Sequence, residues 1–362
     1  MNAMKHASRF SFRSVIGFAS AAAMSSLIFA ACQSSSTDLN MPQLPQEPLS
    51  IPAGFPKPVI PADNPVTPAK VQLGRQLFYD VKLSRDNSTS CASCHSLTAS
   101  FSDPGKAVSF GVSHRQGSRN APALMNVAYD TTFFWDGRAG TLELQALGPI
   151  LNPVELANDS NTVIARLKAD AFYLRMFQEA FPDGNITFQR IGQAIATFER
   201  TLISGASPYD RYMQGDKSAI SPAAQRGLKL FNDTTDLKTN CVSCHSGVNF
   251  TDNSYRSTGL DEFYSDQGRG LISGSSQDFG KFRVPSLRNI FLTAPYMHDG
   301  RFTNLTPVLQ HYNEGGKHNS TQDPLVHQLN LTDAQLSDIT EFLKSLTDDH
   351  FTNNKAFANP NN

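Results

Sequence analysis

The sequence contains the motif Cys-x-x-Cys-His twice, as CASCH at 91–95 and as CVSCH at 241–245. Two cysteines at this spacing can form thioether bonds to the edge of a porphyrin, and the histidine that follows can ligate its iron. A Cys-x-x-Cys pair alone would also suit a redox disulfide or half of a zinc site, but one zinc site needs only four ligands. The repeat therefore predicts two covalent c-type haems, held by Cys91, Cys94 and His95 and by Cys241, Cys244 and His245.

The fifth cysteine, Cys32, follows a segment typical of exported proteins. Residues 1–31 begin with basic residues, continue with an apolar stretch that has no acidic residue, and end in small residues. This pattern predicts a signal peptide that is removed from the mature chain. The preceding FAA resembles a lipoprotein cleavage box, which would place the protein in the periplasm with a lipid anchor on Cys32. The alternative is ordinary signal cleavage that leaves Cys32 as a free thiol.

Composition limits the class of protein and its partners. Of 362 residues, 40% are hydrophobic and 17% are charged, which suits a soluble globular chain of about two domains. The 31 basic residues are matched by 32 acidic ones, and the signal peptide holds three of the basic residues and no acidic one. Nothing in this balance suggests a nucleic-acid partner.

Residues 32–64 are rich in proline and serine. Such a composition favours an extended, poorly helical tether. The alternative is an N-terminal arm whose later part packs across the protein.

After the tether, the chain repeats itself. VQLGRQLFYD follows Thr67 and Pro68, and AQRGLKLFND follows Ser221 and Pro222, so each segment reads as a helix with an N-cap and a proline in its first turn. Further on, APALMNVAYDTTFFWDGRAGTL aligns without a gap with VPSLRNIFLTAPYMHDGRFTNL. The repeats predict two tandem cytochrome c-like haem domains related by internal duplication, at 65–215 and 216–350, followed by a tail at 351–362.

The segments between these motifs are helical in pattern. Apolar residues recur at spacings of three and four within 161–181 and 186–203, and Thr332 with Gln335 forms a capping-box pattern before 333–346. Long alternation of apolar and polar residues is absent from the sequence. We therefore expect a mainly α fold with little regular sheet.

The motifs together resemble the bacterial di-haem cytochrome c peroxidases and their relative MauG. The resemblance covers about residues 65–345 and rests on the two haem motifs, on NAP, on FFWDGRAGTLELQALGPILNPVE, and on PSLRN followed by TAPYMHDGRF. It implies an oxidoreductase in which the N-terminal haem reduces H₂O₂ and the C-terminal haem relays electrons. Peroxide cleavage needs an open iron position, a group that moves a proton between the two oxygens, and two electrons.

The resemblance also implies roles for three residues near the N-terminal haem. Glu155 in NPVE matches the family's distal acid/base, and Gln145 in LELQA matches its pocket partner. Trp135, the only tryptophan, falls where the family places an aromatic residue between its haems. The structural alternatives are a glutamate that caps the following segment and a tryptophan that belongs to the core.

A calcium ion between the haems is implied as well. Asn120 in RNAP, with the carbonyls of Thr293 and Pro295 in TAP, matches the family's calcium site. Calcium suits a shell of amide oxygen, backbone carbonyls and water. Without the resemblance, these residues read as a turn and a strand end.

The sequence departs from the familiar peroxidases at the second ligand of the C-terminal haem. Where they have a methionine, the matching position here is Tyr312, as in MauG. A phenolate stabilises ferric iron, whereas a thioether raises the reduction potential, so this haem should be harder to reduce. Met297 and His311 are competing ligands by position, and a core tyrosine is the structural alternative.

A second departure concerns the distal histidine that blocks the N-terminal haem in resting peroxidases. The matching position is Val112, and His114 lies two residues later. His114 is a candidate distal ligand if its loop moves; otherwise it is a solvated loop residue. Without it, the site would be open at rest and would need no reductive activation.

These observations favour an exported di-haem peroxidase of the MauG-like branch. Its electrons would come from a small donor protein, a cytochrome c or a cupredoxin. One rival function is peroxide-driven oxidation of a partner protein or an organic substrate. The other is a non-enzymatic di-haem electron carrier with both irons six-coordinate. The resemblance also implies a homodimer as the assembly to test.

Overall fold

The computed structural model describes residues 49–235 and 239–361, and these described residues belong to one compact unit. The predicted signal peptide, Cys32 and the first part of the tether lie outside the described residues. Within the described ranges, no helix is long and apolar enough to cross a membrane.

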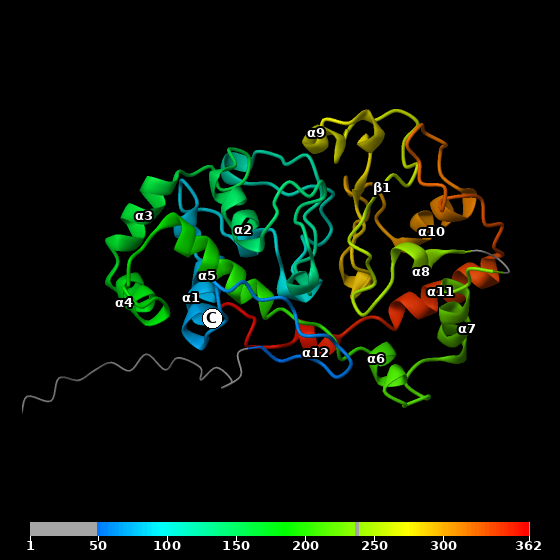
Figure 1. Ribbon diagram of the computed structural model, residues 1–362, viewed down its shortest axis with the longest axis horizontal. Coiled ribbons are helices and arrows are strands. Elements are labelled where there is room, and N and C mark those ends of the chain that lie inside the picture. Colours follow the sequence, from blue (N-terminus) through cyan, green and yellow to red (C-terminus); the bar gives the residue numbers. More distant parts are fainter. Residues whose placement is uncertain (1–48, 236–238, 362) are drawn as a thin grey trace, which may run out of the picture. The chain divides into compact units, whose positions relative to one another are not determined.

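The described chain is mainly helical, as predicted, and carries two lobes (Figure 1). The N-terminal lobe contains α1 (Pro68–Tyr79), α2 (Leu142–Leu151), α3 (Ser160–Lys168), α4 (Ala171–Ala180) and α5 (Phe188–Arg200). The C-terminal lobe contains α7 (Pro222–Phe231), α8 (Cys241–Cys244), α9 (Gly270–Ser273), α10 (Leu305–Glu314) and α11 (Asp333–Lys344). Helix α6 (Pro208–Met213) lies between the lobes in sequence, and α12 (Asp349–Thr352) follows them.

Regular sheet is minimal. The strands β1 (Tyr255–Arg256) and β2 (Phe282–Arg283) pair antiparallel, with Tyr255 opposite Arg283 and Arg256 opposite Phe282. Other pairings between described residues are isolated bridges. The fold therefore rests on helix packing and on long, hydrogen-bonded loops.

The helix starts follow the predicted capping residues. The Thr67 side chain accepts a hydrogen bond from the amide of Lys70, and the Ser221 side chain accepts one from Ala224. Thr332 and Gln335 form the reciprocal capping box at the start of α11. Each cap satisfies a backbone donor that the first helical turn leaves without an intrahelical partner.

In each lobe, two helices cross at a glycine. Gly74 of α1 faces the carbonyl of Ala194 on α5, and Gly227 of α7 faces the carbonyl of Asp338 on α11, so closely that a Cβ at either glycine would overlap that carbonyl. Figure 1 shows these two helix pairs, α1 with α5 and α7 with α11. The glycines allow the backbones to approach and bring the paired helices together beside each haem motif.

Three phenylalanines at equivalent positions pack at the centre of each lobe. Phe78, Phe101 and Phe198 have ring centroids 5.4–6.3 Å apart in the N-terminal lobe. Their counterparts Phe231, Phe250 and Phe342 are 5.0–6.1 Å apart. Edge-to-face contact, seen in all three pairs of the first lobe and in the Phe231–Phe250 pair of the second, adds to the burial energy of each ring.

The gapless sequence repeat holds in the structure. The 3₁₀ turns Val127–Tyr129 and Ile290–Leu292 occupy matching positions, as do the bridges Phe133–Ala139 and Tyr296–Phe302. Helices α2 and α10 are both ten residues long and start at matching leucines. As a result, Pro149 and Tyr312 occupy the same position of equivalent helices.

Both ends of the described chain pack against the lobes. Phe55 lies edge-on to Tyr129, and the amide of Asn64 donates to Glu143 at 2.7 Å, so residues 49–64 form an arm rather than a free tether. At the other end, Arg75 of α1 donates to the carbonyls of Ala358 and Lys355 at 2.7 and 2.9 Å.

Charged groups connect the lobes. Arg119, beside the NAP sequence, forms an ion pair with Asp266 of the C-terminal lobe at 2.6 Å and also contacts Asp136. The backbone amide of Asn120 donates to the carbonyl of His298 at 2.7 Å.

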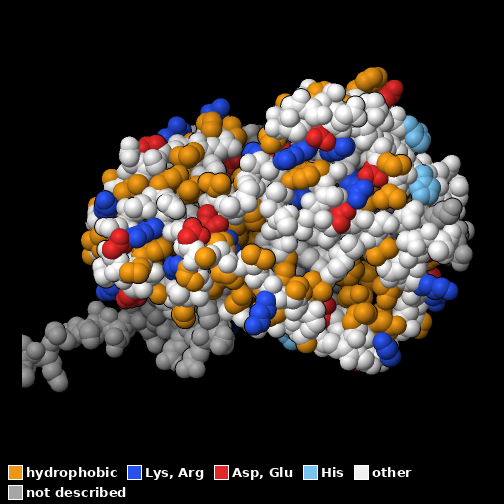
Figure 2. All heavy atoms as spheres, in the orientation of Figure 1, with side chains coloured by type: hydrophobic (Ala, Val, Ile, Leu, Met, Phe, Trp, Pro, Cys, Tyr) orange, Lys and Arg blue, Asp and Glu red, His pale blue; other side chains and the backbone are white. Residues whose placement is uncertain are grey.

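On the face shown in Figure 2, the Lys and Arg side chains are dispersed among acidic and neutral ones.

Candidate functional site

Each haem motif lines a cavity of its own lobe. The N-terminal cavity, of about 430 Å³, is lined by Cys91, Cys94 and His95, and the C-terminal cavity, of about 270 Å³, by Cys241, Cys244 and His245. All four cysteines are unpaired. Thiols and imidazole therefore face one space in each lobe, as thioether attachment and iron ligation require.

The two histidines are oriented in the same way. Nδ1 of His95 lies 2.6 Å from the carbonyl of Phe101, and Nδ1 of His245 lies 3.0 Å from the carbonyl of Phe250. A carbonyl only accepts, so Nδ1 carries the proton and Nε2 keeps its lone pair. Burial lowers the pKa of both imidazoles, which favours the neutral, ligating form. Both phenylalanines have positive φ, near 60° and 50°, which aims their carbonyls at the rings.

Glu155 and Gln145 face the N-terminal cavity together. The Asn152 amide donates to Oε1 of Glu155. Burial raises the pKa of Glu155, although this hydrogen bond opposes the shift. Oε1 of Gln145 is buried without a hydrogen-bond partner. The cavity thus holds a carboxyl that keeps its proton to a higher pH than usual, beside an amide oxygen that can accept a hydrogen bond.

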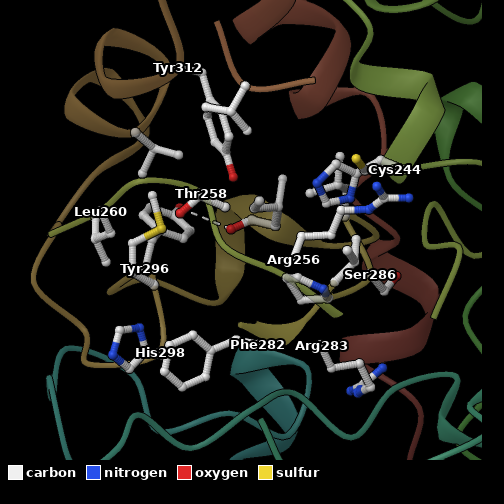
Figure 3. Close-up of a pocket in the computed structure, with 18 of the residues that line it drawn as sticks. Cys244, Arg256, Thr258, Leu260, Phe282, Arg283, Ser286, Tyr296, His298 and Tyr312 are labelled. Atoms are coloured by element: carbon white, nitrogen blue, oxygen red, sulfur yellow. Dashed lines mark hydrogen bonds between the residues drawn. The ribbon is translucent and has the colours of Figure 1, made fainter. Parts of the chain in front are cut away.

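Tyr312 and Met297 line the C-terminal cavity, whereas His311 does not. Figure 3 shows the Tyr312 hydroxyl directed into the cavity, which Cys244 also lines. Burial raises the pKa of this phenol. His311 instead lies with Nε2 3.0 Å from the carbonyl of Thr258, which accounts for one of its two ring nitrogens. Of the three candidate ligands, the structure thus brings Tyr312 and Met297 to the cavity.

Trp135 belongs to the walls of both cavities. Its indole N–H donates to the carbonyl of Asn120 at 2.8 Å, and its own carbonyl accepts from the amide of Arg283 at 2.8 Å. The ring is thus fixed to the N-terminal lobe and the backbone of Trp135 to the C-terminal lobe, and the residue lines both cavities.

The residues of the expected calcium site lie together on the wall of the C-terminal cavity. Asn120, Thr293 and Pro295 all line it. The Asn120 amide nitrogen donates to the carbonyls of Lys106 and Ala107 at 3.2 and 3.1 Å, which fixes the side chain. The described residues hold no cluster of three or more His, Cys, Asp or Glu that could bind a metal. An ion at Asn120 would therefore depend on amide and backbone oxygens.

The structure does not bring His114 to the N-terminal cavity. His114 is exposed, has a left-handed φ of 55°, and is not among the lining residues. The backbone amide of neighbouring Val112 donates to the carbonyl of Glu155 at 2.8 Å, which holds this loop beside the carboxyl. As folded here, His114 does not close the site.

Sequence reasoning missed two residues of the N-terminal cavity, Pro149 and Glu199. Pro149 stands where the repeat places Tyr312, and it carries no group that can ligate iron. Glu199 stands where α11 has Leu343. Both positions can be recognised in the sequence when the repeat is extended. Pro149 follows from the alignment of α2 with α10. Glu199 follows from a separate alignment of α5 with α11, which has a different offset in residue number.

The residues present fit two covalently bound haems. Each cavity is lined by two unpaired thiols and by an imidazole whose Nδ1 is held by a backbone carbonyl, and the N-terminal cavity also leaves the oxygen of Gln145 without a partner. Helix pairs that cross at glycine beside a Cys-x-x-Cys-His motif define the class of protein, a di-haem c-type cytochrome with two tandem domains.

Comparison with known proteins places the chain within this class. The pattern of the family "Di-haem cytochrome c peroxidase" matches residues 68–218, and that of "Cytochrome c" matches residues 224–347. The methylamine utilization protein MauG of Methylophilus methylotrophus is 38% identical over 85% of this chain and 89% of its own. The cytochrome c peroxidase Ccp of Escherichia coli K12 is 39% identical over 67% of this chain and 52% of its own.

A solved structure is similar over nearly the whole described chain. A MauG-like protein associated with microbial copper homeostasis superimposes with a TM-score of 0.81, at 35% identity, over 86% of this chain and 99% of that one. The chain thus belongs to the di-haem cytochrome c peroxidase and MauG family, whose members are di-haem oxidoreductases.

Proposed function

We propose that the protein reduces H₂O₂ at the N-terminal haem with electrons relayed from the C-terminal haem. The observation that carries this proposal is the asymmetry of the repeat. At one position of equivalent helices, the C-terminal cavity has Tyr312, whose phenol oxygen can ligate iron, and the N-terminal cavity has Pro149, which has no such group. The first arrangement suits an iron that only exchanges electrons, and the second leaves room for a small substrate.

Bound haem would supply an iron that exchanges electrons and accepts an oxygen ligand. The chain would hold the two groups through His95 and His245, and through the thioether bonds of the four cysteines. Tyr312 would supply the second ligand of the C-terminal haem as a hard anionic donor. Trp135, which is shared by both cavities, would provide the path between them.

Glu155 would manage the proton of the peroxide. Because burial raises its pKa, a share of the carboxyl stays protonated where an exposed glutamate is ionised, so the same group can accept a proton and return it. Asn152 fixes one carboxyl oxygen, which leaves the other for the substrate. Gln145 would orient the peroxide by accepting a hydrogen bond at its unpartnered oxygen.

The test is stopped-flow mixing of the fully oxidised protein with one equivalent of H₂O₂, repeated after one haem is reduced. We expect the oxidised form to react at once, because His114 does not occupy the cavity. Glu155→Gln should slow peroxide turnover by about 10²- to 10⁴-fold. Glu179→Gln, at an exposed position of α4, is the matched control and should leave turnover unchanged.

Three outcomes would count against the proposal in different ways. Reaction of the half-reduced form alone would show a peroxidase that needs reductive activation. Unchanged turnover in Glu155→Gln would remove Glu155 from the mechanism. Failure of both forms to react, with low-spin spectra for both haems, would favour an electron carrier.

A second candidate function is peroxide-driven oxidation of a protein or organic substrate. The placement of Tyr312 in the C-terminal cavity and the similarity to MauG support it. A peroxidase should consume H₂O₂ in step with oxidation of a reduced cytochrome c or cupredoxin. An oxidase of this second kind should leave such donors unoxidised.

The finer assignments belong to the same proposal. Asn120 with the carbonyls of Thr293 and Pro295 would hold Ca²⁺ between the haems. The signal-like residues 1–31 and Cys32 would export the protein to the periplasm and anchor it by a lipid, and a homodimer is the assembly to test.

A further inference from the structure

The N-terminal cavity contains a buried carboxyl that the proposed mechanism does not use. Glu199 lies in the last turn of α5, is 3% exposed, and lines the cavity together with Cys91 and His95. Its Oε2 is buried without a hydrogen-bond partner. A buried, unpaired carboxylate is costly, so a carboxyl in this position needs a specific explanation.

The C-terminal lobe shows what a haem cavity of this fold has without the carboxyl. Along α5 and α11, Ile195 matches Ile339, and Phe198 matches Phe342, with both isoleucines lining their cavities. The same register pairs Glu199 with Leu343, which lines the C-terminal cavity. An apolar side chain therefore satisfies the packing at this position, and the carboxyl is particular to the N-terminal site.

The neighbouring charges compensate Glu199 only in part. Arg200, the next residue, is committed to Glu143 of α2 through two hydrogen bonds of 2.7 and 3.0 Å. On the side of α1, Phe78 packs against α5 through Phe198. In the cavity wall, burial and the charge of Glu199 both raise the pKa of the Cys91 thiol, which would lose its proton on attachment of the porphyrin.

We propose that Glu199 is the group of the N-terminal haem site that takes up a proton when the site is reduced, a role separate from that of Glu155 toward the peroxide. When one electron enters this site, the Glu199 carboxylate takes one proton from solvent. When the electron leaves, it returns the proton, so that the charge of the cavity stays constant. This inference rests on the proposed function, since it assumes that a haem in this cavity changes its oxidation state.

The electrostatics agree with this role. Burial raises the pKa of Glu199 to about 8, and the charge of Glu143 acts in the same direction while Arg200 opposes it. An added electron in the same low-dielectric cavity would raise the proton affinity further. Over the pH range in which the carboxyl changes state, the midpoint potential of the N-terminal haem should therefore fall as pH rises.

The experiment is a spectroelectrochemical titration of the haem-loaded protein from pH 6 to pH 10, with Tyr312→Met used to identify the signal of the C-terminal haem. In the parent protein, the N-terminal haem should show a potential that falls with pH in this range. In both Glu199→Gln and Glu199→Leu, that pH dependence should be lost, and the C-terminal haem should behave as in the parent. Leu343→Glu should give the C-terminal haem a pH dependence that it otherwise lacks.

The inference is overturned if Glu199→Gln and Glu199→Leu keep the parental slope, or if the C-terminal haem shows the same slope in the parent protein and loses it in these variants. A purely structural glutamate would lower the melting temperature without flattening the titration. Haem content, measured by the pyridine haemochrome spectrum, shows that each variant is fully loaded. The titration uses no peroxide, so a protein that failed to turn over H₂O₂ would still report on Glu199.

Discussion

At the scale of single residues, the two haem sites differ by a few side chains on a repeated frame. Pro149 and Tyr312 share a helix position, Glu199 and Leu343 share another, and the histidine orientation is the same in both. The chemistry proposed for each lobe thus depends on the few positions at which the two repeats carry different side chains.

We expect Tyr312→Met to raise the midpoint potential of the C-terminal haem. A thioether favours ferrous iron and a phenolate favours ferric iron. The control is Tyr296→Phe, because Tyr296 lines the same cavity but donates its hydroxyl to the carbonyl of Ile290 at 2.9 Å. Redox titration of both variants checks the prediction. Equal potentials in Tyr312→Met and Tyr296→Phe would argue that Tyr312 is a core residue.

The sequence predicted the residues that lie in a haem motif or a family motif more reliably than those that no motif marks. The haem motifs, Glu155, Gln145, Trp135 and Tyr312 were found, and all of them face the cavities. Glu199 was not, because in sequence it is one charged residue of an amphipathic helix beside Arg200. Its burial follows from the crossing of α5 with α1, which local periodicity does not encode. His114 was named as a candidate ligand only because it lies two residues after the position that matches the family's distal histidine. In the structure, its loop leaves it exposed.

At the scale of elements, each lobe depends on two helices that cross at a glycine, where no side chain fits between the backbones. We expect Gly74→Ala to lower the free energy of unfolding by about 1–3 kcal/mol, because its Cβ would overlap the Ala194 carbonyl. Alanine is otherwise the better helix former, so propensity alone predicts the opposite sign. Chemical denaturation measures the difference. Gly140→Ala is the control, since a Cβ there meets nothing within 4 Å.

Helix boundaries were largely predictable because caps are local. Thr67, Ser221 and Thr332 begin their helices as the sequence indicated. The loops were not predictable, because their shape comes from left-handed residues such as Asn126 and Asn289, whose partners lie far away. The amide of Asn126, for example, donates to the carbonyl of Leu202 at 2.7 Å.

At the scale of the whole molecule, ion pairs hold the lobes in register around Trp135. We expect Arg119→Gln to destabilise the fold by about 2–3 kcal/mol, because two acidic residues, Asp136 and Asp266, lose a cation in a largely buried position. Arg226→Gln is the matched control. Arg226 also forms a two-bond pair with an aspartate, Asp338, but its side chain is 62% exposed, so the loss should stay below about 1 kcal/mol.

Thermal unfolding followed at both haem bands would check this prediction. The reduced stability should appear in Arg119→Gln alone. Similar losses in the two variants would show that the contact between the lobes contributes no more than a surface pair. The arm at 49–64 and the closing residues could not be placed from sequence, because proline-rich and short polar segments carry no periodic pattern.

Residues 351–358 complete the packing of the first lobe. Phe351 packs on Phe101, Tyr79 donates its hydroxyl to the carbonyl of Phe357 at 2.7 Å, and Arg75 holds the carbonyls of Lys355 and Ala358. During synthesis, the N-terminal lobe therefore emerges first but lacks part of its packing until residues 351–358 have followed. The order of translation and the order of completion are reversed, because the lobe that is made first is completed after the second lobe.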